Sequence, residues 1–111
     1  MKKTGIERHH DVSIKGLRNE MLFGLTITAQ VFANFDLRAV IVAGTEGNDG
    51  DGIHKDGSLF YQGCALAFQK RKVAEAYHEI FLEQLESQLG RGFRVVDKNT
   101  CYEVEYHGEE A

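Results

Sequence analysis

The side chains of this sequence that could do chemistry are its histidines, its two cysteines and several carboxylates. The histidines are His9, His10, His54, His78 and His107, and the cysteines are Cys64 and Cys101. No Cys-x-x-Cys pair occurs, so the ligand spacing that is typical of a structural zinc site is missing. Two thiols in 111 residues do not form a disulfide framework, and we expect both to be reduced.

His54 is the histidine with the strongest claim to a metal site, because it follows a loop rich in glycine and aspartate (44–52). Histidine, thiolate and carboxylate all bind transition metals. His54 could therefore share an ion with Cys101, Glu103 and His107, although no fixed spacing supports that set. A solvent-exposed loop histidine is the simpler interpretation.

Hydrophobic periodicity predicts two helices and four strands around these residues. Apolar residues spaced by three and four predict a helix that is capped by Ser13 and runs to about Asn34. A second helix is predicted over 70–89 and should end at Gly90. Its expected buried stripe is Val73, Ala76, Tyr77, Ile80, Phe81, Gln84 and Leu85. The predicted strands are 37–43, 57–68 with a bend at Gly63, 93–97 and 101–106.

This order of elements predicts an α+β fold in which a small antiparallel sheet packs against two main helices. We expect a flexible N-terminus (1–12), a single domain (13–107) and a flexible tail (108–111). The formal net charge of −4 offers no basic face for nucleic acid. No apolar run approaches the ~18 residues of a membrane span, and no apolar stretch of a signal peptide follows the N-terminal lysines. We therefore expect a cytoplasmic protein with neither nucleic-acid nor membrane partners.

Three stretches carry a resemblance to a known family: LRAVIVAG (37–44), SLFYQGCALAF (58–68) and CYEVEY (101–106). In order and spacing they resemble the zinc D-Ala-D-Ala carboxypeptidase and L-alanyl-D-glutamate endopeptidase family, particularly its small phage-borne members. That family has the motifs Asp-Gly-x-His, matched at 51–54, Ser-Leu-His-Tyr-x-Gly-x-Ala-x-Asp and His-x-His-Val-Glu-Tyr. The resemblance spans roughly residues 13 to 107 and implies the fold that these peptidases share with the hedgehog signalling domain.

The same resemblance implies where zinc would be bound, and this chain lacks most of the ligands. By position, the first histidine and the aspartate fall on Phe60 and Ala67, and the second histidine falls on Glu103. The general base falls on Thr100. Only Glu103 could bind a metal there, whereas catalytic zinc needs about three protein ligands. We expect no metal, no cofactor and no catalysis at this site, which makes the chain a pseudo-peptidase.

A pseudo-peptidase would act by binding, and apolar Phe60 and Ala67 would give it a drier cleft that suits a protein partner. The expected cleft residues are His54, Ser58, Phe60, Tyr61, Cys101 and Glu105. The phage-borne relatives imply a phage or prophage protein that targets a host protein, for example as an inhibitor of a defence system, or a homodimer. Two alternatives stay open: a hydrolase with a relocated metal site (His54, Cys101, Glu103, His107), and a binder of peptidoglycan peptides that does not cleave them.

Overall fold

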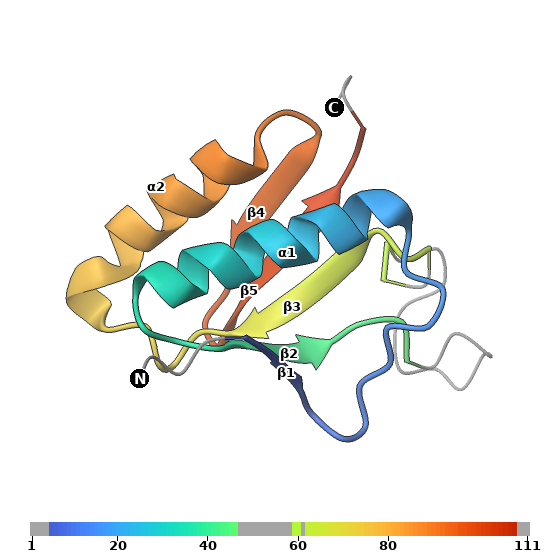
Figure 1. Cartoon of the computed structure of the whole chain (residues 1–111), viewed down its shortest axis with the longest axis horizontal. Coiled ribbons are helices and arrows are strands. Elements are labelled where there is room, and N and C mark those ends of the chain that lie inside the picture. The colour runs from blue at the N-terminus through green and yellow to red at the C-terminus, as the bar shows by residue number, and fades with distance from the viewer. Residues whose placement is uncertain (1–4, 47–58, 61, 109–111) are drawn as a thin grey trace.

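The computed structural model describes residues 5–46, 59, 60 and 62–108. Its elements are β1 (Ile6–Arg8), α1 (Asn19–Asn34), β2 (Ala39–Ala43), β3 (Ala65–Gln69), a 3₁₀ turn η1 (Glu75–Tyr77), α2 (His78–Leu89), β4 (Phe93–Asp97) and β5 (Cys101–Tyr106). The predicted α+β class is confirmed: a five-stranded, mostly antiparallel sheet packs against two helices (Figure 1). Within these described residues, no helix is both long and apolar enough to cross a bilayer.

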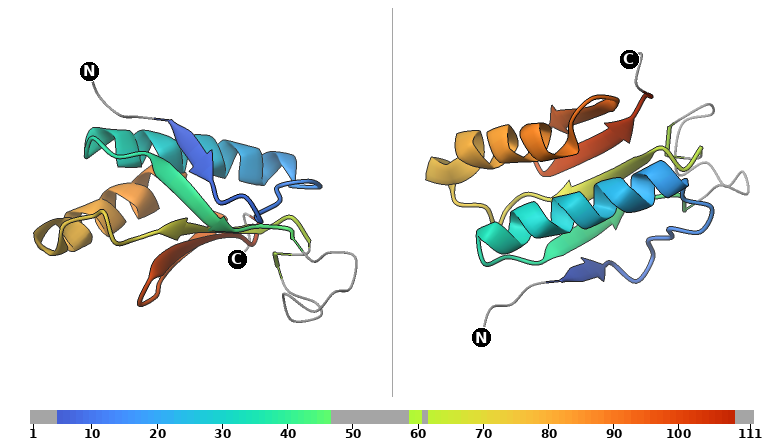
Figure 2. Two further views of the ribbon diagram at one scale, coloured as in Figure 1. Left: turned by 90° about the horizontal axis from the view of Figure 1, so that it is seen from below. Right: turned by 45° about the horizontal axis from the view of Figure 1, so that its top comes forward.

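The strand order is β1-β2-β3-β5-β4, with β1 parallel to β2 and every other neighbouring pair antiparallel. Figure 2 shows that both helices cover the same face of this sheet. Because side chains alternate along a strand, each strand divides its residues between the two faces. The residues of β3 and β5 that are buried beneath the helices are Leu66, Phe68, Tyr102 and Val104. The opposite side, called the helix-free face below, carries Ala65, Ala67, Cys101, Glu103 and Glu105.

The N-terminal segment departs from the sequence prediction, because part of the expected flexible region 1–12 belongs to the sheet. Ile6, Glu7 and Arg8 pair in parallel with β2 and form an edge strand. All three residues are exposed, so β1 shows neither a buried face nor the apolar alternation by which a strand is recognised in a sequence. Backbone pairing, and not side-chain burial, holds this strand in place.

The first helix begins later than predicted, at Asn19, and Ser13 does not cap it. Ser13 instead joins its own loop to the loop that follows β2. Its carbonyl accepts a hydrogen bond from the Thr45 N–H at 2.7 Å, and its own N–H donates to the Glu46 carboxylate at 3.2 Å. These bonds hold the approach to α1 against the end of β2.

The second helix is also shorter than predicted, since it is preceded by η1 and begins at His78. Its buried residues are Phe81, Leu85 and Leu89, which recur every four residues. Tyr77 and Ile80, both expected in the buried stripe, are 53% and 50% exposed. Gly90 ends the helix as predicted, with a φ of 76°.

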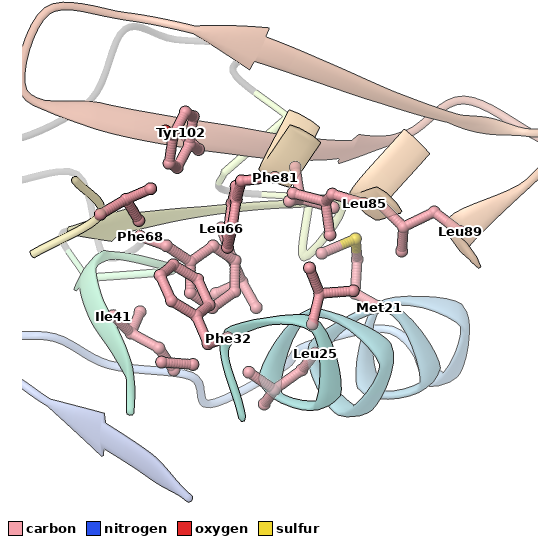
Figure 3. Packing of buried hydrophobic residues seen from close by; sticks show 14 of the residues in the cluster. Met21, Leu25, Phe32, Ile41, Leu66, Phe68, Phe81, Leu85, Leu89 and Tyr102 are labelled. Atoms are coloured by element: carbon pink, nitrogen blue, oxygen red, sulfur yellow. The ribbon is translucent and has the colours of Figure 1, made fainter. Parts of the chain in front are cut away.

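Aromatic contacts join the helices to the sheet (Figure 3). Phe32 of α1 lies 4.7 Å from Phe81 of α2 and 6.1 Å from Phe68 of β3, measured between ring centroids. Phe81 stacks on Tyr102 of β5 at 5.0 Å. Edge-on and offset contacts of this kind are favourable beyond the burial of area. The largest buried side chains therefore lie between the helices and one face of the sheet, while the helix-free face carries the small, buried Ala65 and Ala67.

Candidate functional site

The central feature of the helix-free face is the pairing of Ala67 with Glu103. Ala67 in the middle of β3 is the direct register partner of Glu103 in β5, so both side chains point to the same side. Ala67 is 2% exposed. These are two of the positions that the resemblance assigns to zinc ligands, and the fold brings them side by side. One offers a methyl group and the other a carboxylate.

The Glu103 carboxylate already has a cationic partner. Lys98, in the turn between β4 and β5, places its Nζ 2.7 Å from Glu103 Oε2. The hydrogen bond to Glu103, followed by the charge of that carboxylate, raises the pKa of Lys98. A cation that bound to Glu103 would have to displace this ammonium group. The ion pair therefore neutralises the charge of the Glu103 carboxylate and makes it a poorer metal ligand.

The other two positions implied by the resemblance lie toward opposite ends of the sheet. The chain enters β3 through a turn in which the Phe60 carbonyl accepts a hydrogen bond from the Gly63 N–H at 3.1 Å. Thr100 immediately precedes β5, and its carbonyl accepts a bond from the Lys70 N–H at 3.3 Å, just beyond the far end of β3. Among the four positions, only Ala67 and Glu103 are register partners.

The length of β5 argues against a relocated metal site that uses residues from both of its ends. Cys101 opens β5, whereas His107 follows its last residue. Six residues of extended chain span about 20 Å, so these two side chains do not reach one ion. His107 Nε2 lies 2.9 Å from Glu105 Oε1, and His54 lies outside the described residues. The described part of the chain contains no group of three or more His, Cys, Asp or Glu side chains suited to a metal.

Both thiols are free in the structure. Cys64 is buried. Burial, followed by the charge of Glu103, raises the pKa of the half-buried Cys101 thiol. Because the thiolate is both the nucleophile and the metal ligand, this environment makes Cys101 less reactive than an ordinary cysteine.

The expected cleft is only partly described by the structure. Cys101 and Glu105 lie on the helix-free face, in the same row of β5 as Glu103. Ser58 and Tyr61 lie, like His54, outside the described residues. The structure also places a residue of β4 beside this row. Val96 is the register partner of Glu103 on the side of β5 that faces away from β3.

No protein-family model matches the chain, and no curated protein or solved structure is significantly similar to it. Function is therefore inferred from the residues themselves and from their arrangement.

Sequence reasoning missed a second surface, a basic cleft at the end of the sheet where β3 finishes. Arg8, Arg38, Arg71 and Lys72 line a cavity of about 480 Å³ there. The sequence signal was the Lys-Arg-Lys run at 70–72, which was assigned to the start of the predicted helix 70–89. The structure places that run outside any helix, between β3 and η1.

Proposed function

We propose that this chain acts by binding a protein partner on its helix-free face and does not hydrolyse peptides. The observation that carries the proposal is the Ala67–Glu103 pair, with the Glu103 carboxylate bound to Lys98 at 2.7 Å. A zinc-bound water becomes reactive near neutral pH only when the metal is held by about three ligands. A methyl group and a neutralised carboxylate do not supply such a set.

The shape of the helix-free face also supports a protein partner. Ala65 and Ala67 are small and almost fully buried, so neither projects from the face, and its accessible surface is formed by the neighbouring residues of β5 and β4. Val96 adds a partly buried apolar side chain beside Glu103. An accessible apolar side chain surrounded by polar groups is compatible with a protein interface. The resemblance to small phage-borne peptidases further supports a host protein as the partner.

The first experiment restores the ligands that the resemblance implies. We expect wild-type protein, purified without an affinity tag, to bind no stoichiometric zinc in mass-spectrometric metal analysis and calorimetry. On the geometry that the resemblance implies, the variant Phe60→His/Ala67→Asp/Glu103→His should gain one zinc per chain, and the single variant Ala67→Asp should not. Stoichiometric zinc in the wild-type protein that disappears in Glu103→Gln would instead support a hydrolase.

The second experiment locates the partner on the face. Wild-type protein, Val96→Arg and the control Gln88→Arg, which alters an exposed position on α2, serve as baits in quantitative pull-downs from host lysate. We expect one protein to be enriched by the wild type and the control but lost with Val96→Arg. Circular dichroism and thermal melting establish that all three baits are folded. Equal capture by the three baits would contradict binding at the helix-free face.

A further inference from the structure

The basic cleft gathers cationic residues from β1 and from the segments that directly precede β2 and follow β3. Arg38 directly precedes β2, while Arg71 and Lys72 follow the end of β3. Because β2 and β3 are antiparallel, those two ends are adjacent, and β1 contributes Arg8 from the outer edge. Together these residues line a cavity of about 480 Å³, a volume within the range of ligand-binding clefts.

The charge of this cleft is opposite to that of the whole chain. Four basic and two acidic residues line the cleft, a formal surplus of two positive charges, although the Arg8 guanidinium donates to the Val12 carbonyl at 2.9 Å and leaves three cations for a ligand. The chain as a whole carries a formal net charge of −4. The ion pair between Arg38 and Glu7 is 3.4 Å long, and both side chains are about half exposed, so it is weak and easily exchanged. The cleft therefore attracts anions although the protein is acidic.

An apolar surface continues from the basic cleft. A neighbouring cavity of about 410 Å³ shares Asp36, Leu37 and Lys72 with it and is also lined by Phe35 and Tyr77. The Tyr77 side chain is 53% exposed and lies 6.1 Å from Phe35, measured between ring centroids. We call this surface, formed by Phe35, Leu37, Val73, Ala74 and Tyr77, the aromatic shelf. A ligand that spans both cavities would meet cations first and an aromatic ring next.

We propose that the basic cleft and the aromatic shelf together bind an acidic segment of a partner polypeptide. Carboxylates of the segment pair with Arg38, Arg71 and Lys72, and a large apolar side chain packs on Tyr77. Guanidinium groups are suited to this, since they bind carboxylates with two parallel hydrogen bonds. The inference rests on the proposed function only in taking the partner to be a protein.

Two features favour a polypeptide over a phosphorylated small molecule. The Glu7 and Asp36 carboxylates at the cleft can accept hydrogen bonds from the N–H groups of a peptide backbone, which a phosphate group does not offer. The cleft also runs beside β1, an edge strand, where an extended segment can add to the sheet. An acidic, extended chain with one apolar anchor complements the cations of the cleft, the edge strand and the Tyr77 ring.

The test is a titration of isotope-labelled full-length protein with the peptide acetyl-Glu-Glu-Asp-Glu-Phe-amide, followed by amide chemical shifts. We expect saturable shifts at residues 7–9, 36–38, 69–72 and 77, and weaker binding as salt is raised. The variant Arg71→Glu/Lys72→Glu should weaken the affinity by about tenfold or more. The control Arg91→Glu, a charge reversal outside the cleft, should change it by less than about twofold. A peptide with alanine in place of phenylalanine should no longer shift Tyr77.

Three results would overturn this assignment: shifts that do not saturate or that map elsewhere, equal losses in the cleft variant and in Arg91→Glu, or tighter binding of inorganic phosphate or ADP than of the peptide at these residues. The proposed function fails by a different measurement, namely stoichiometric zinc in the wild-type protein. If the wild-type protein hydrolysed peptides but still bound the acidic peptide at these residues, the proposed function would be refuted and the proposed site for an acidic segment would not.

Discussion

The Lys98 ammonium group donates a hydrogen bond to the Glu103 carboxylate across the turn that joins β4 to β5, with an N–O distance of 2.7 Å. Lys98 is about half exposed, so solvent screens the pair, and its contribution to stability should lie below about 1 kcal/mol. The raised pKa of Lys98 means that this contribution is present below its ordinary value of 10.5 and is lost as pH rises through the raised value. A double-mutant cycle of Lys98→Met and Glu103→Gln, measured by urea unfolding at neutral pH in low and in high salt, gives the coupling energy. An equal coupling at both salt concentrations would show that the pair is not ionic.

The backbone at Gly63 predicts an unusually damaging substitution. Gly63 has a φ of 75°, and a Cβ placed there would collide with the backbone carbonyl of Gly16. Gly90 has nearly the same φ, 76°, but open space around the corresponding position. We expect Gly90→Ala to cost about 1–2 kcal/mol from backbone strain alone. Gly63→Ala should cost more, above about 2 kcal/mol, because the backbone must also move. Chemical unfolding of both variants measures the difference, and equal costs would refute the contact with Gly16.

Much of the fold follows from local patterns in the sequence. The hairpin strands 93–97 and 101–106 were predicted with the bounds of β4 and β5, because alternating apolar residues flank a short polar turn. Gly63 was predicted as a bend inside a strand over 57–68, but β3 begins only at Ala65, and Gly63 lies in the turn before it with a positive φ that suits glycine. Helix starts were predicted less well. Neither Arg18 nor Tyr77, the residues that precede the two helices, makes a side-chain capping bond that a sequence signature could reveal.

What the sequence could not show is which distant residues meet. Gly24 looks like a flaw in α1, yet a Cβ there would press on the Phe93 ring, so close helix–strand packing accounts for it. The basic cleft depends on β1, a strand without any apolar pattern, and on the antiparallel return of β3 beside β2. The Ala67–Glu103 pair likewise depends on the register of β3 against β5. Pairing between strands that are far apart in the sequence is a property of the folded chain, and no single local pattern identifies the partner strand.

The Tyr102 hydroxyl group is buried and has no hydrogen-bond partner in the described structure. Burial, followed by the negative charge of Asp97, raises the Tyr102 pKa to about 12 from its ordinary value of 10.0. The neutral phenol is thus favoured in the folded state, and the wild-type protein should lose stability as pH rises from about 10 toward 12. Tyr102→Phe should unfold at the same denaturant concentration as the wild type, or higher, near pH 7, because it removes an unsatisfied polar group. Its advantage should grow above pH 10. A loss of more than about 1 kcal/mol at pH 7 would reveal a bond to the hydroxyl group.

Two neighbouring residues of α2, Ile80 and Phe81, show where the observed core differs from the buried stripe that the sequence predicted. Ile80 and Phe81 were both expected to be buried, but Ile80 is 50% exposed and Phe81 is fully buried. Phe81→Ala should lower the free energy of unfolding by about 3–5 kcal/mol, because the Phe32, Phe35 and Tyr102 rings would face a cavity. Ile80→Ala should cost less than about 1 kcal/mol, since alanine favours a helix and little area is lost. Guanidinium unfolding of the two variants measures both costs. Similar values for both would place α2 in a different rotation on the sheet, with the Tyr77 side of the helix turned inward and the aromatic shelf closed.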